Sequence, residues 1–397
     1  AASVSAEYTF CQDTYAGVFD SRCIVTLPPY EYIDTPGAWR QCLTRLRKES
    51  RLAVDVEANS LYAYRERVCL FQVSIPDHDY IIDPLAELDL APLGKLIANP
   101  AVQKVFHCCE YDLMLLNAEY GWRIRNLFDT MWAGRLLGHT HMGLAAFLKA
   151  HFDVDLSKRH QKANWGRRPL PEKLLAYAQK DTHYLLDLCD ELEAQLEIAG
   201  LREEAQDIFD CECVARTPDR AFRPDGFWSI RGVRGLNSRE RAIFKELYVA
   251  RDREARRRDW PPFKVMSNEA MLTLAREAPT HFNDVKQVRG ISKRLSSQFG
   301  TRLLKAIARG KKARPPKEPP KPPRQRRDVS ARYKALFAWR KAVAEERGVE
   351  SDVIMSRETL WEIARLNPKT PADLKALNSL GPYRRKRYAD AVLEALR

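Results

Sequence analysis

The sequence predicts an α/β domain with a mixed sheet, followed by two all-α helical bundles. Strand-like and helix-like segments alternate up to about residue 196, and one helical pattern occurs twice in the last third of the chain. The charge also changes sign, because residues 1–230 carry 25 Lys and Arg against 34 Asp and Glu, whereas residues 231–397 carry 41 against 19. A basic second part is typical of a protein that holds a polyanion, and a basic surface that serves solubility is the alternative.

The strands and helices of the first domain can be assigned in order along the chain. Residues 1–29 form an irregular N-terminal arm. Period-two alternation predicts strands at 52–57, 68–75, 80–83, 104–107 and 126–129. Helical periodicity predicts helices at 35–50, 110–118, 130–137, 143–152 and 171–199. The first domain is therefore expected over 30–205, and turn signals predict a connector over 206–235.

The last third contains two copies of one helical pattern, 89 residues apart. Met266-Ser267 and Met355-Ser356 each precede an amphipathic helix for which the serine is a suitable N-cap. The pattern predicts helical bundles at 236–310 and 329–397. Between them, residues 311–328 include six prolines and eight Lys or Arg, which favour an extended basic linker that seeks phosphate. A linker that is merely hydrated is the alternative.

Composition limits the class of protein. A chain of 397 residues is expected to form about two or three domains, and its 45% hydrophobic content is enough for packed cores. The apolar runs are too short to cross a bilayer, no signal segment opens the chain, and its start at Ala1 is expected of a trimmed protein. The nine cysteines match neither a zinc site nor a disulfide framework. A soluble protein of the reducing cytosol is expected.

Two carboxylates on one face of the first predicted strand carry the most information. Side chains alternate across a strand, so Asp55 and Glu57 face away from Leu52, Val54 and Val56. The two acids should lie roughly 6.5–7 Å apart along the chain. They repel each other unless they share a proton or a cation. The pattern indicates a divalent metal site, and an amphipathic strand with a hydrated face is the alternative.

Two later segments supply further acids. Asp181 occupies the apolar stripe of the predicted helix 171–199, where it needs a cation, strong donors or a nearby arginine. Tyr177 lies one turn earlier on the same face. Asp112 begins a helix after the strand that ends at His107, where a purely structural negative charge is the alternative. Together the acids suit two divalent cations and a phosphate, and without a Gly-rich loop nucleotide triphosphate hydrolysis is not expected.

Asp55-x-Glu57, Asp112 and Tyr177-x-x-x-Asp181 resemble the DEDDy signature of the DnaQ-type 3′→5′ exonucleases, whose fold is ribonuclease H-like. The chain more narrowly resembles the bacterial ribonuclease D family, through segments 69–72, 128–130 and 165–170. The two tail copies look like helicase-and-RNase-D C-terminal (HRDC) domains. The resemblance covers about 30–200 and most of 236–397.

The resemblance implies roles for particular residues. Asp55, Glu57, Asp112 and Asp181 would bind two divalent metal ions, Mg²⁺ or Mn²⁺, and Tyr177 would orient or help deprotonate the attacking water. The chain would then release nucleoside 5′-monophosphates from RNA 3′ ends, with transfer RNA precursors as the typical substrate. No small-molecule cofactor and no membrane partner are expected, and the protein is expected to be a cytoplasmic monomer.

Three more residues are candidates for substrate contacts. Leu61 resembles an apolar wedge under the terminal base, and a loop leucine that closes the core is the alternative. His107 and Arg168 are candidates for phosphate or scaffold contacts. Basic pairs and runs such as Lys293-Arg294 and 384–387 could grip the RNA backbone. A DNA 3′→5′ exonuclease and a non-catalytic nucleic-acid binding module remain alternative functions.

Overall fold

The computed structural model describes residues 27–214, 221–320 and 325–397, so most of the predicted arm over 1–29 lies outside the described residues. Its first part, up to residue 214, is built on a six-stranded sheet with the order β1-β4-β3-β2-β5-β6. The strands are β1 Glu31–Ile33, β2 Arg51–Ala58, β3 Val68–Ile75, β4 His78–Ile82, β5 Gln103–Phe106 and β6 Leu127–Asp129. Three neighbouring pairs are parallel and two are antiparallel. The predicted mixed sheet is confirmed.

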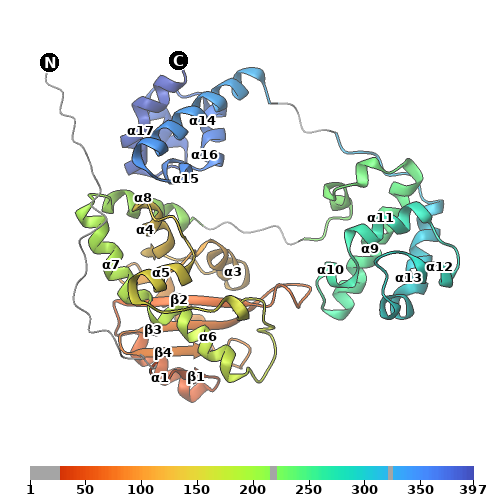
Figure 1. Ribbon diagram of the computed structural model, residues 1–397, viewed down its shortest axis with the longest axis horizontal. Helices are drawn as coiled ribbons and strands as arrows, with labels where there is room; N and C mark the ends of the chain where they lie inside the picture. Colours follow the sequence, from red (N-terminus) through yellow and green to blue (C-terminus); the bar gives the residue numbers. More distant parts are fainter. Residues whose placement is uncertain (1–26, 215–220, 321–324) are drawn as a thin grey trace.

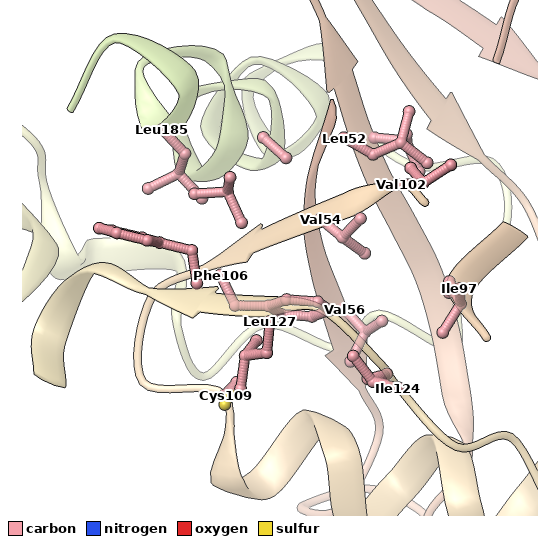
Figure 2. Packing of buried hydrophobic residues seen from close by; sticks show 14 of the residues in the cluster. Leu52, Val54, Val56, Ile97, Val102, Phe106, Cys109, Ile124, Leu127 and Leu185 are labelled. Atoms are coloured by element: carbon pink, nitrogen blue, oxygen red, sulfur yellow. The ribbon is translucent and has the colours of Figure 1, made fainter. Parts of the chain in front are cut away.

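Two separate hydrophobic clusters lie on the faces of this sheet. Figure 2 shows Leu52, Val54 and Val56 of β2 in the larger cluster, together with Phe106 and Leu127 from the neighbouring strands. This cluster also receives side chains from α1 Pro36–Leu46, α2 Ala91–Ile97, α3 Glu110–Tyr120, α4 Thr130–Leu136 and α5 Leu144–Phe152. The smaller cluster joins β3 and β4 to α6 Glu172–His183. Helix α6 therefore covers the sheet face that carries Asp55 and Glu57.

The helix predicted over 171–199 is two helices. α6 ends at His183 and α7 spans Leu185–Ile198, with Tyr184 between them. Leu174 and Ala178 of α6 pack in the smaller cluster, whereas Leu185 and Leu188 of α7 pack in the larger one. A straight helix could not serve both clusters, so the apparent single apolar stripe belongs to two helices.

The described residues of the expected connector, 206–214 and 221–235, contain helical elements. α8 spans Arg202–Glu212, and its Ala205, Ile208 and Phe209 complete the larger cluster. The short 3-10 helices η2 Pro224–Ser229 and η3 Val233–Gly235 pack Phe227 and Val233 into the first bundle. Two buried acids of α8, Glu204 and Asp207, interrupt its apolar stripe, so the helical period is not visible in the sequence.

Two helical bundles follow, as the repeat predicts (Figure 1). The first holds α9 Ser238–Arg258, α10 Pro262–Val265, α11 Asn268–Glu277, α12 Phe282–Gln287 and α13 Lys293–Lys312. The second holds α14 Arg327–Arg347, α15 Ser351–Ile354, α16 Arg357–Leu366, η4 Pro371–Ala376 and α17 Pro382–Ala395. Residues 311–312 and 327–328 of the expected linker are thus helical. No helix in the described part of the chain is long and apolar enough to cross a membrane.

The repeat extends to buried hydrogen bonds. Ser267 and Ser356 cap α11 and α16, accepting from Ala270 and Thr359, as predicted. One arginine in each bundle, Arg251 or Arg340, also donates to the main-chain oxygen of Met266 or Met355, at 3.1 and 2.8 Å. These arginines are 89 residues apart, like the methionines, so the copies share a buried polar contact as well as a helix order.

Buried charges join the second bundle to the first domain. Arg347 donates to Glu204 of α8 at 2.8 and 2.9 Å, and Arg384 donates to Asp207 at 2.7 Å. Glu204 is 0% and Asp207 4% exposed. Figure 1 shows the second bundle beside α8 and α4. Because each buried acid has its arginine, this contact is specific as well as close.

Candidate metal centre

Asp55 and Glu57 lie in the second half of β2, beyond its pairing with β5. Leu52, Val54 and Val56 are buried on one face, and the two acids are half-buried on the other, as the alternation predicts. β2 pairs with β5 only from Arg51 to Ala53, whereas β2 remains paired with β3 up to Ala58. The acids therefore lie where β2 keeps only one of its two neighbouring strands.

Helix α6 brings a third carboxylate to this place. One carboxylate oxygen from each of Asp55, Glu57 and Asp181 lies within 4.8 Å of the other two. The Tyr177 hydroxyl hydrogen-bonds to Asp181. The Tyr177 ring packs against Trp165, at 6.2 Å between centroids, and against His160, at 5.8 Å. The structure thus brings together side chains from β2 and α6 that the sequence analysis assigned to one site.

Asp112 approaches the same cluster from the first turn of α3. It is 7% exposed and stands outside the group of three close carboxylates. Its charge nevertheless contributes to the raised pKa of Glu57, and burial followed by Asp55, Asp129 and Asp181 raises its own pKa well above the usual value. The four predicted acids therefore interact electrostatically, with three of them in close contact.

Asp129 takes the structural role that was the alternative for Asp112. Its carboxylate accepts from the main-chain N–H groups of Cys108 and Cys109, at 3.1 and 2.8 Å, just before α3. It also caps α4 by accepting from Met131 and Trp132. One buried carboxylate thus holds the turn before α3 and caps α4, and Asp112 contributes its charge to the cluster instead. Asp129 directly precedes the helix predicted at 130–137, and an aspartate in that position is a typical N-cap, so the sequence could have indicated this role.

Burial raises the pKa of all four acids, and repulsion from neighbouring carboxylates raises the pKa of Glu57, Asp112 and Asp181 further. Burial, opposed by a main-chain hydrogen bond from Val56, raises the pKa of Asp55 from 3.8 to about 7. Burial and then the charges of Asp55, Asp181 and Asp112 raise the pKa of Glu57 to about 10. Burial and Asp55 raise the pKa of Asp181 well above its usual value. No cation of the described chain is among the causes of these shifts.

This donor set fits divalent cations. Hard cations such as Mg²⁺ and Mn²⁺ prefer carboxylate oxygens, and a carboxylate cluster without a basic partner supplies charge that only a cation or protons can balance. Asp55, Glu57 and Asp181 would hold such ions, with Asp112 at the edge of the group. When bound, the ions would activate a water and stabilise a leaving oxygen on phosphorus.

Arg168 lies in the scaffold beside the site. Its five guanidinium N–H groups donate to both carboxylate oxygens of Asp83 and to the main-chain oxygens of Cys69, Trp165 and Arg167. These bonds tie the loop before α6 to β3 and to the end of β4. Because every donor is used within the protein, the structure favours the scaffold alternative for Arg168 over a phosphate contact.

His107 is also engaged within the protein. Its Nδ1 is 2.8 Å from the Thr130 hydroxyl, and its Nε2 is 3.0 Å from the main-chain oxygen of Met142. Burial lowers its pKa, although the Asp129 charge opposes this. His107 therefore links the end of β5 to the start of α4 and to the loop before α5, which again favours the scaffold alternative.

The loop between β2 and β3 connects the site to the first bundle. Leu61 in this loop is 37% exposed, so it does not close the core, and its contact with a substrate stays a prediction. Tyr64 donates its hydroxyl to Asp252 at 2.6 Å and accepts from Arg256 at 2.8 Å, both on α9. Lys264 stacks over the Tyr62 ring at 3.8 Å. The strand that carries Asp55 and Glu57 thus leads directly into a contact with the first bundle (Figure 1).

Comparison with known proteins agrees with this architecture. The 3′-5′ exonuclease family matches residues 30–197, and the HRDC domain family matches residues 240–307 and 329–396. Ribonuclease D of Acidiphilium cryptum is 32% identical over 350 residues, which cover 85% of this chain and 87% of that protein. An exosome complex component 10 homolog of Caenorhabditis elegans is 35% identical over 259 residues, which cover 63% of this chain.

The relatives differ in length. The chain spans less than a third of the exosome component 10 proteins that it matches, at 26% to 29% of their length. The solved catalytic core of RRP6 from Trypanosoma brucei superposes with a TM-score of 0.65 and 28% identity, covering 73% of this chain and 81% of that one. The resemblance inferred from the sequence is confirmed, and the chain belongs to the ribonuclease D family of exoribonucleases, with a 3′-5′ exonuclease domain and two HRDC domains.

Proposed function

We propose that the protein hydrolyses RNA from the 3′ end and releases nucleoside 5′-monophosphates with the help of two divalent ions, Mg²⁺ or Mn²⁺. The observation that carries the proposal is the convergence of Asp55, Glu57 and Asp181 within 4.8 Å, with Asp112 beside them. Family membership and the 3′-5′ exonuclease match support it. In this proposal the four acids hold the ions and the terminal phosphodiester lies over them.

Tyr177 orients the attacking water in this proposal. Burial and the charges of Asp181, Glu57 and Asp55 raise the pKa of its hydroxyl, which therefore keeps its proton at neutral pH. A protonated phenol beside a metal ligand donates a hydrogen bond but accepts no proton. Of the two roles that the resemblance implies, orientation of the water is supported by this environment, and proton removal is not.

RNA is the proposed substrate class, because the curated relatives of comparable length are ribonucleases D. Transfer RNA precursors, a monomeric state and a cytoplasmic location remain our predictions. All cysteines in the described part of the chain are free, which is compatible with a reducing compartment. Lys293, Arg294, Lys386 and Arg387 are exposed and are proposed to contact RNA phosphates. Arg384 is instead committed to Asp207.

Degradation of 3′-labelled and 5′-labelled RNA and DNA with Mg²⁺ or Mn²⁺ tests the proposal. We expect the 3′ label to leave first as a mononucleotide, RNA to be preferred, and activity to vanish in chelator. Asp55→Asn is the matched control, which should bind RNA without shortening it. Release of the 5′ label first, full activity in chelator, or preference for DNA would each contradict the proposal, and the last would favour a DNA exonuclease.

A further inference from the structure

A buried amide without a partner lies beside the metal centre. Gln72 on β3 is 0% exposed, and both its Nε2 and its Oε1 lack a hydrogen-bond partner among the described residues. Most buried side-chain polar atoms in proteins are paired, and an unpaired buried amide destabilises the fold. A glutamine in the middle of a fully buried strand therefore requires an explanation other than stability.

The register of the sheet places this amide next to a catalytic acid. Gln72 is the cross-strand partner of Asp55 in the antiparallel pair β2–β3. Residues directly opposite in such a pair point to the same face, with Cβ atoms about 4.5–5.5 Å apart. The side chain of Gln72 thus lies on the sheet face that carries the acids and is covered by α6.

The other neighbours of Gln72 on this face offer its amide no free hydrogen-bond partner. Its cross-strand partner on β4 is Ile81, which is apolar and fully buried. Ser74, two residues along β3, already donates to Asp79 at 2.6 Å and lies 2.7 Å from the Thr182 hydroxyl. Asp55 is therefore the carboxylate that register places directly beside the free amide.

We infer that Gln72 is a positioning residue whose amide donates to the Asp55 carboxylate when that carboxylate binds a divalent cation. Ligating carboxylates are commonly held by a hydrogen bond from a second group, and loss of that group weakens metal binding. Asp55 accepts a hydrogen bond from the main chain of Val56, which leaves its carboxylate able to accept another. The amide is thus kept unpaired in the fold for an acceptor that metal binding orients. This inference rests on the proposed function of the site.

A second buried glutamine provides a matched control. Gln179 on α6 is 3% exposed, but its amide donates to the main-chain oxygen of Pro28 and to Asp79, both at 2.7 Å. Gln→Met keeps the length of the side chain and removes its polar atoms. The same substitution at the two sites therefore compares an unpaired amide with a paired one.

The test combines three kinds of measurement on the full chain. They are the thermal midpoint in chelator, Mg²⁺ and Mn²⁺ affinity by calorimetry, and kcat and KM on RNA. For Gln72→Met we expect a midpoint in chelator that is unchanged or about 2–4 °C higher. We also expect about tenfold weaker metal binding and a lower kcat at unchanged KM. For Gln179→Met we expect a lower midpoint with metal affinity retained.

Each outcome has one meaning. Wild-type metal affinity in Gln72→Met, or a midpoint lowered as in Gln179→Met without a loss of metal affinity, would overturn the inference and assign Gln72 to packing. If the unmodified protein binds no divalent cation in the same calorimeter, the proposed function fails first. Weaker metal binding together with a retained or raised midpoint supports the positioning role, since a packing residue would not separate the two.

Discussion

Raising the pH of the metal-free protein should destabilise its first domain, because the clustered acids hold protons in the folded state. The pKa of Asp55 is raised from 3.8 to about 7, so between these values the folded chain binds more protons than the unfolded chain. Stability therefore falls as pH rises through this window, and the loss is complete above pH 7. For Asp55 alone the change corresponds to an upper bound of about 4 kcal/mol.

Thermal unfolding of the full chain in chelator at pH 5 and pH 8 measures the part of this loss that falls above pH 5, which for Asp55 alone has an upper bound of about 2.7 kcal/mol. For a domain of this size, such a change lowers the midpoint by at most roughly 5–11 °C. Amide hydrogen exchange of the β2 peptide identifies the transition that belongs to the first domain. Asp55→Asn carries no charge at this position, so its midpoint should depend less on pH and exceed the wild-type midpoint at pH 8.

Addition of Mg²⁺ supplies the second half of the test. A bound divalent cation neutralises the carboxylates as the protons do at lower pH. It should therefore restore the wild-type midpoint at pH 8 and have a smaller effect on Asp55→Asn. Equal pH dependence in the two proteins, or a wild-type protein that loses no stability between pH 5 and pH 8, would refute the reasoning. Glu57, whose pKa is raised to about 10, should extend the loss to higher pH.

Three further changes have separate outcomes. Tyr177→Phe should lower kcat on RNA by about 10²-fold at unchanged KM, and equal losses in both constants would contradict water orientation. Tyr64→Phe removes the hydroxyl that joins the β2–β3 loop to α9, so hydrogen exchange in residues 59–67 should accelerate about tenfold, and an unchanged rate would show that the contact does not hold the loop. Arg384→Met leaves buried Asp207 without its arginine and with only the Tyr383 N–H as donor, which should cost about 3–5 kcal/mol in urea unfolding of the full chain. Adding Asp207→Asn should recover part of this, and a cost that persists in the double variant would indicate lost packing instead.

The strands and helices that the sequence predicts well are those whose hydrophobic residues recur with a clear period. β3 has the predicted bounds, and β2 differs by one residue at each end. The alternation in β2 also predicts that Asp55 and Glu57 share a face, because side-chain direction in a strand follows from sequence position alone. By contrast, β1 has three residues and α2 has seven, which is too short for either period to be visible.

The sequence could not show which groups satisfy one another across the fold. Asp112, Asp129 and Asp181 are alike as isolated acids, and each could have capped a helix or paired with an arginine. Only the structure shows that Asp129 caps α4 and binds the turn before α3, and that Arg168 donates to Asp83 and to main-chain oxygens. For the same reason the sequence of segment 69–72 indicates the family but not the role of Gln72, since the missing partner of its amide is a property of the packed sheet.

The buried acids of α8 decide how the RNA-binding role of the second bundle has to be tested. Deleting residues 311–397 would remove Arg347 and Arg384 and leave Glu204 and Asp207 uncovered on a helix that completes the first core. A loss of affinity after such a deletion would therefore mix damage to the nuclease domain with loss of phosphate contacts. Replacing the exposed Lys386 by serine leaves these contacts in place, whereas Arg387 donates to the Tyr383 hydroxyl and interacts with Glu204. If the Lys386 side chain contacts single-stranded RNA, the slope of log affinity against log salt should fall by about 0.7, and an unchanged slope would mean that this residue of α17 does not touch the backbone.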